Sequence, residues 1–78
     1  MIPVEKAEKI ALESVKNRKL LVRSNLTDSW MFSFYYPDGT PAYDSSIRVY
    51  KEDGRSEQWN PLRHPDEYRA KYIDSFHY

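Results

Sequence analysis

The sequence predicts a small α+β domain, built from an antiparallel sheet of three or four strands with a helix at each end of the chain. An apolar stripe at helical spacing opens the chain, segments that alternate apolar and polar residues follow, and a proline-initiated segment at helical spacing closes it. The length of 78 residues allows one domain, 1–78. We expect the N-terminal and C-terminal helices to pack on one face of the sheet, in α-β-β-β-α order.

The first helix is predicted from Pro3 to about Lys19. Pro3 suits the first helical position, where its missing N–H has no intrahelical partner to lose. Basic side chains gather at the far end, where the helix dipole favours them. The apolar residues of one face recur every three or four positions: Val4, Ala7, Ile10, Ala11 and Val15.

The strongest strand signal is Trp30–Tyr36, in which aromatic side chains occupy alternate positions. The short apolar run Leu20–Ser24 before it is either a first strand or an extended connection. The segment 37–41 contains two prolines and a glycine, so it predicts a loop. Ser46–Lys51 and 55–59 are predicted to pair as a hairpin around the Glu52-Asp53-Gly54 turn.

The last helix is predicted to begin at Pro65, with acidic residues in its first turn. Tyr68, Tyr72 and Phe76 recur at about one helical turn and form its apolar stripe. This stripe and that of the first helix are expected to cover the aromatic face of the sheet.

Charge and composition exclude several classes of function. Lys and Arg total 12, as do Asp and Glu, and both signs are spread along the chain. We therefore expect no nucleic-acid partner and no membrane partner, because both usually require a basic cluster. The absence of Cys excludes disulfides and thiolate zinc sites. With no signal peptide and no apolar run longer than three residues, a cytoplasmic protein is expected.

The sequence predicts no enzyme, no metal site and no cofactor. His64 lies close to Asp66 and Glu67, but this pattern is typical of a helix start and matches no metal-ligand spacing. Gly39 and Gly54 are the only glycines, so the chain has neither a nucleophile elbow nor a phosphate-binding loop. An acid–base role for His64 is the enzymatic alternative, and it requires a concave pocket around that side chain.

The second face of the predicted sheet carries the candidate binding surface. Its side chains alternate with the core positions and so point away from the helices. Tyr, Trp, Met and Arg are enriched at protein interfaces. Two further aromatic residues, which a small core explains poorly, complete the candidate partner-binding set: Met31, Tyr35, Arg48, Tyr50, Tyr43 and Trp59. An amphipathic sheet face without a partner is the alternative interpretation.

Three hypotheses of function follow from this surface. The leading one is a small non-enzymatic protein-binding module of bacterial type, an inhibitor or immunity protein that acts through the exposed aromatic face. The alternative is a structural or accessory domain that homodimerises through the same face. The third is stacking of single-stranded nucleic-acid bases on the aromatic rings, which the lack of a basic groove disfavours.

Three short patterns carry a resemblance to a known family: Trp30-x-Phe32-x-Phe34, Ile47-x-Val49-x-Lys51-x-Asp53-Gly54 and Pro65-x-Glu67-Tyr68-x-x-x-Tyr72. Over Ala7 to Ile73, their order resembles small bacterial proteins of the immunity protein 35 type and YrhB-like chains. The helix–sheet–helix plan of these proteins is similar to that of PepSY domains. The resemblance implies a toxin-neutralising role, although this chain lacks the family's Gly-Asn-x-Pro stretch before the hairpin. It implies no functional residue.

Overall fold

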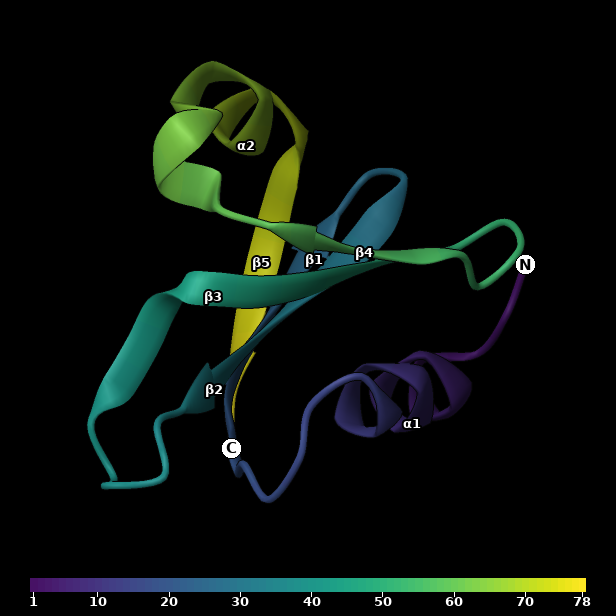
Figure 1. Ribbon diagram of the computed structural model, residues 1–78. Helices are drawn as coiled ribbons and strands as arrows, with labels where there is room; N and C mark the ends of the chain where they lie inside the picture. The colour runs from purple at the N-terminus through teal and green to yellow at the C-terminus, as the bar shows by residue number, and fades with distance from the viewer.

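The computed structural model describes residues 1–78, except for the side chain of Asp44. It has an α+β fold with one antiparallel sheet of five strands, in the order β4-β3-β2-β1-β5 (Figure 1). The predicted fold class is confirmed, but the predicted number of three or four strands is wrong. In chain order the elements are α1 (Val4–Glu13), β1 (Leu20–Leu26), β2 (Ser29–Tyr35), β3 (Pro41–Tyr50), β4 (Ser56–Trp59), the 3₁₀ helix η1 (Pro61–Arg63), α2 (Pro65–Lys71) and β5 (Tyr72–His77).

Helix α1 begins at Val4, one residue later than predicted, with Pro3 as its extended N-cap residue. It ends at Glu13 and does not reach Lys19. The chain reverses beyond it through Asn17, whose φ of 55° lies in the left-handed region. Asn tolerates this conformation better than most residues, because its short polar side chain can hydrogen-bond locally. The basic residues expected in the last helical turn therefore lie in the connection to β1.

The main core lies between α1 and the sheet. Ala7 and Ala11 are completely buried, and their small side chains let the helix approach the strands closely. They face the aromatic and aliphatic residues of β2 and β3, which occupy alternate positions as the sequence predicts: Phe32, Phe34, Ile47 and Val49. The aromatic strand signal thus marked the core correctly.

The strand predictions for the first 60 residues are largely confirmed. Leu20–Ser24 belongs to the true strand β1, which settles the alternative left open by the sequence. β3 starts earlier than expected, at Pro41, which pairs with Tyr35. Proline is tolerated there because it is the first residue of the strand.

The C-terminal helix is much shorter than the sequence predicts. α2 begins at Pro65 but ends at Lys71, and the next six residues form β5 beside β1. A four-residue spacing such as that of Tyr72 and Phe76 is compatible with both a helix and a strand, because four is a multiple of two and close to 3.6. The β-favouring Ile73 helps to select the strand.

The predicted packing of both helices on one face is also wrong. Figure 1 shows α1 and α2 on opposite sides of the sheet. Met31, which alternates with the core residue Phe32, packs instead with Leu26, Trp59 and the α2 residue Tyr68. The two helices have 10 and seven residues, and neither is long and apolar enough to span a membrane within the described part of the chain.

Candidate binding groove

A groove of about 680 Å³ lies on the α2 side of the sheet. Its floor comes from β1 and β2, one wall comes from η1 and α2, and β5 and β3 supply the rest of its lining. The lining is mostly apolar: Val22, Ser24, Met31, Ser33, Tyr43, Pro61, Leu62, Pro65, Tyr68, Arg69, Tyr72, Ser75 and His77. We name this feature the α2 groove.

Small hydroxyl side chains on the floor help to form the α2 groove. Ser24 and Ser33 alternate along their strands with larger residues of the opposite face, so they leave space above the sheet. The Ser33 and Ser46 hydroxyls hydrogen-bond to each other at 2.9 Å and satisfy both buried groups. Ser24 Oγ lies 3.1 Å from the Tyr68 hydroxyl and joins the floor to α2 by a hydrogen bond.

Aromatic rings hold η1 and α2 against the sheet. The His64 and Trp59 rings are stacked, with centroids 5.4 Å apart and an interplanar angle of 6°. Tyr68 contacts Trp59 at 6.4 Å and Tyr72 at 5.5 Å between ring centroids. His64, considered above as an acid–base residue, is exposed and packs its ring on Trp59.

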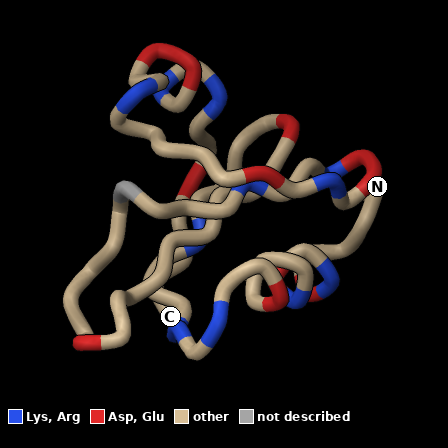
Figure 2. Tube along the Cα trace, viewed as in Figure 1, with Lys and Arg blue, Asp and Glu red and all other residues tan. Residues whose placement is uncertain are grey.

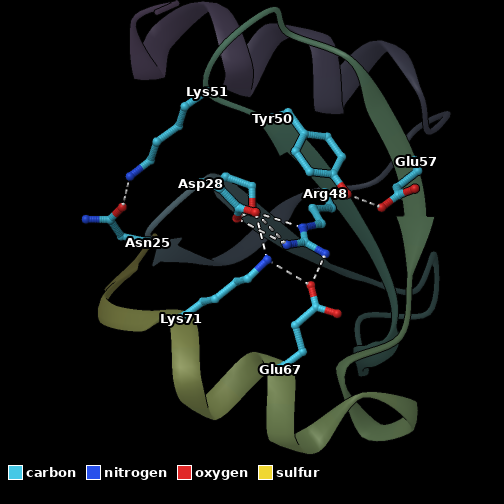
Figure 3. Close-up of polar contacts among 9 residues, drawn as sticks. Asn25, Asp28, Arg48, Tyr50, Lys51, Glu57, Glu67 and Lys71 are labelled. Atoms are coloured by element: carbon cyan, nitrogen blue, oxygen red, sulfur yellow. Dashed lines mark hydrogen bonds and ion pairs between the residues drawn. The ribbon is translucent and has the colours of Figure 1, made fainter.

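A buried arginine joins α2 to the sheet (Figure 3). The side chain of Arg48 is only 3% exposed. Its Nη1 donates to Glu67 Oε2 on α2 at 2.8 Å, and its Nη2 donates to Asp28 in the β1–β2 turn at 3.1 Å. Lys71 Nζ donates to both carboxylates, at 2.8 Å to Asp28 and 3.2 Å to Glu67. We name these four residues the Arg48 network.

Arg48 is further enclosed by neutral groups. Its Nε donates to Ser29 Oγ at 2.9 Å, and its guanidinium lies 4.6 Å from the Trp59 ring centroid and 4.9 Å from that of Tyr50. A buried guanidinium is stable only when its donors are satisfied and its charge is paired. This arrangement meets both conditions.

The Arg48 network shifts the pKa values of its members. Burial opposes ionisation of Asp28, but hydrogen bonds from Lys71, Ser29 and Arg48 outweigh it and hold the pKa of this carboxyl well below 3.8. Hydrogen bonds from Arg48 and Lys71 likewise lower the pKa of Glu67. The hydrogen bond to Asp28 raises the pKa of Lys71. All three side chains are therefore charged at neutral pH.

The charge on the groove lining differs from that of the whole chain. Acidic and basic residues are both distributed along the Cα trace (Figure 2). Among the described side chains that line the groove, however, Arg69 is the one with a permanent charge, and no Asp or Glu lines it. The groove is thus an apolar site with one cation. The described side chains contain no group of three or more His, Asp or Glu that could hold a metal ion.

The structure divides the candidate binding residues predicted from the sequence. Met31 and Tyr43 both line the α2 groove, Met31 buried in its floor and Tyr43 53% exposed. Arg48 and Trp59 were expected on an open face, and this expectation is wrong, because they are 2% and 8% exposed. Arg48 donates to Glu67 of α2, and the Trp59 ring contacts His64, between η1 and α2, and Tyr68 of α2.

The remaining two predicted residues lie at opposite ends of the sheet. Tyr50 pairs with Ser29 at the start of β2, and Tyr35 pairs with Pro41 at its end. Six residues of extended strand separate these ends by roughly 20 Å. The Tyr50 hydroxyl donates to Glu57 Oε1 at 2.8 Å. The predicted set is therefore not one continuous patch.

Sequence reasoning missed the η1 and α2 wall of the groove. Pro65 was interpreted only as the start of a helix. The signal that could have found the wall is Leu62, an apolar residue between Pro61 and Pro65 that is 72% exposed. A second signal was Ser33, because so small a residue beside Met31 on the second face leaves space above the sheet.

Comparisons with known proteins do not assign the chain to a family. No family model matches it, and neither a curated protein nor a solved structure matches it significantly. The resemblance to immunity protein 35 and YrhB-like proteins therefore stays a prediction.

Proposed function

We propose that this chain is a non-enzymatic protein-binding module whose α2 groove receives an apolar segment of a partner protein that carries an acidic residue. The observation that supports this most directly is the open apolar groove with Arg69 on its lining. The proposal keeps the function expected from the sequence and moves its location from an open sheet face to the groove.

Exposed apolar side chains at the groove support binding by burial. Leu62 is 72% exposed and Tyr43 is 53% exposed, and both line the groove. Covering such side chains stabilises a complex by about 25 cal/mol for each Å² of apolar surface removed from water. Exposed apolar surface of this kind is typical of interaction sites.

The charge of the lining favours an acidic segment over a basic one. A carboxylate beside Arg69 can accept paired hydrogen bonds from the guanidinium. A Lys or Arg at the same position meets a like charge. The hydroxyls of Ser24, Ser33 and Ser75 provide further polar contacts for the backbone of a bound segment. Occupation of the groove by such a segment is a mode of action suited to an inhibitor or immunity protein.

The proposal is tested by selecting random peptides displayed on phage against the purified chain. Enriched peptides are expected to combine apolar residues with Asp or Glu. Fluorescence anisotropy with a synthetic copy of an enriched peptide then measures its affinity for the chain. Replacing the acidic residue of that peptide by Lys is expected to weaken binding about tenfold, or ~1.4 kcal/mol.

Two matched variants locate the binding site. Leu62→Asp puts a carboxylate on the groove wall and is expected to weaken binding of the enriched peptide at least about tenfold. Leu12→Asp makes the same change at a residue of α1, which is 38% exposed and is expected to leave binding unchanged. A selection without enrichment, or equal binding by the two variants, rejects the proposal.

A further inference from the structure

The strand β5 presents an unpaired edge in the described structure. It lies at the end of the strand order and pairs with β1 on one side. The Tyr78 N–H donates to the Leu21 carbonyl at 3.2 Å, so the backbone groups of Phe76 also point toward β1 by the alternation of an antiparallel ladder. The N–H and C=O groups of Ser75 and His77 therefore point away from the sheet.

The edge at β5 lacks protection that the opposite edge has. β4 has four residues, includes Glu57 and is followed closely by Pro61. β5 has six residues, and it contains neither Lys nor Pro; Asp74 is its one acidic residue. Protein edges are usually protected by charges, by proline or by short length, because an open edge recruits another strand.

Large apolar side chains flank this edge on both faces of the sheet. Ile73 is 52% exposed and Phe76 is 50% exposed. Phe76 lies under the Arg23 guanidinium at 4.8 Å and makes an edge-to-face contact with Tyr78 at 5.1 Å. A strand added to β5 would cover these side chains in addition to pairing the backbone.

We propose that the added strand is β5 of a second copy of this chain, paired antiparallel about a twofold axis at Phe76. In this register Phe76 lies opposite the same residue of the other copy. Ser75 pairs with His77 on each side of the axis, which supplies roughly four backbone hydrogen bonds. An aromatic pair at a non-hydrogen-bonded position brings the two rings close together and stabilises the pairing.

Charge favours this register and this occupant. A shift that places Asp74 opposite itself brings two carboxylates together. A shift that places Ser75 on the axis puts Asp74 opposite Phe76. The Phe76 register avoids both arrangements. Beside it, Arg23 lies 3.8 Å from Glu8, so the charge on this side of the edge is balanced, and the whole chain has a formal net charge of zero. Two copies can approach without net repulsion.

The proposal is tested by sedimentation velocity of the full chain at increasing concentration. A concentration-dependent dimer is expected between about 10 and 500 µM, since an edge contact is small. Phe76→Lys and Phe76→Glu each place like charges opposite one another and are expected to be monomeric over this range. An equal mixture of these two variants is expected to form heterodimers, because Lys and Glu then face each other across the axis.

Leu12→Lys is the matched control, because it adds the same charge at an exposed apolar residue of α1 and not on the edge strand. It is expected to dimerise like the unmodified chain, and circular dichroism checks that all variants fold. A monomer at every concentration overturns the proposal. The proposal is also overturned if Phe76→Lys dimerises by itself and Phe76→Glu does not, because that result places Asp74 opposite residue 76. Peptide binding to the α2 groove is measured separately, so either proposal can fail alone.

Discussion

Helix α1 on one face of the sheet completely buries Ala7 and Ala11, whereas α2 on the other face buries none of its seven residues. α1 packs against aromatic and aliphatic side chains of β2 and β3. α2 is held mainly by the Arg48 network and by the ring contacts of Tyr68.

These two kinds of contact respond differently to solution conditions. Apolar burial does not depend on the protonation of carboxyl groups, whereas an ion-pair network does. α2 should therefore loosen under conditions that leave α1 in place. Local opening of this kind is common where few apolar contacts are buried.

The largest expected effect is on the α1 side. Phe32→Ala removes a completely buried ring from the core and should destabilise the fold by about 4 kcal/mol. Domains of this size have a total stability of roughly 4–12 kcal/mol, so much of it should be lost. Urea denaturation followed by circular dichroism measures the change. Phe76→Ala, at a half-exposed ring, should cost less than half as much, and an equal cost would contradict this account.

On the α2 side, Arg48→Met should destabilise the protein by about 3 kcal/mol. The change removes a buried cation and leaves Asp28 and Glu67 paired only with Lys71. Thermal denaturation should show a Tm lower by roughly 15 °C. Arg55→Met is the control, because Arg55 is exposed beside Tyr50, 4.4 Å from its ring centroid. A similar Tm for both variants would show that the network contributes little.

Acid is expected to affect the α2 side of the sheet before the α1 side. The folded-state pKa values of Asp28 and Glu67 lie below their ordinary values of 3.8 and 4.5, so their ionised forms stabilise the fold. This stabilisation is complete above the ordinary values and is lost as pH falls through them toward the lowered ones. The indole N–H signals of Trp59, under α2, and Trp30, near α1, report on the two faces in one nitrogen–proton NMR spectrum.

The Trp59 signal is expected to change at a higher pH than the Trp30 signal. Glu67→Gln removes one of the titrating groups and should reduce the pH dependence at Trp59 alone. Simultaneous change of both indole signals would mean that the two faces unfold as one unit.

The smallest effect is expected for Lys71→Met. The Lys71 side chain is 34% exposed, and its carboxylate partners are more exposed still. Solvent screens such pairs, so the variant should lose about 0.5 kcal/mol. Urea denaturation with and without 1 M NaCl, which reduces the Debye length to about 3 Å, should show a smaller salt effect in the variant. Lys9→Met on α1 provides the control, and equal salt effects in both would contradict the prediction.

Much of the fold up to Trp59 could be predicted because its signals are local. The alternation of Trp30, Phe32 and Phe34 has one structural interpretation, and so does the turn at Gly54, whose φ is 77°. The end of the chain lacked such a signal. Tyr72 and Phe76 fit either period, and pairing with the distant strand β1 selected the extended form.

The candidate site was predictable only in part for the same reason. Tyr43 was named as an aromatic residue that a small core explains poorly, and it lines the groove with 53% of its surface exposed. Met31 was expected to face solvent, but it is only 4% exposed and lies in the floor of the groove. The burial of Arg48 and Trp59 could not be predicted, because it depends on η1 and α2 lying across that face. The position of η1 and α2 depends on the pairing of β5 with β1, which are distant in the sequence.

The connection from β4 to β5 also bears on the order of folding. β4 and β5 occupy opposite edges of a five-stranded sheet, so η1 and α2 carry the chain about 19 Å across three strands. The hairpins from β1 to β4 join neighbouring segments, whereas β5 must close a loop back to Leu26 and Val22. Closing so long a loop carries a larger entropic cost than closing a hairpin. We therefore expect the four-stranded meander to assemble first and the C-terminal segment to dock last, as a separate slow phase in refolding.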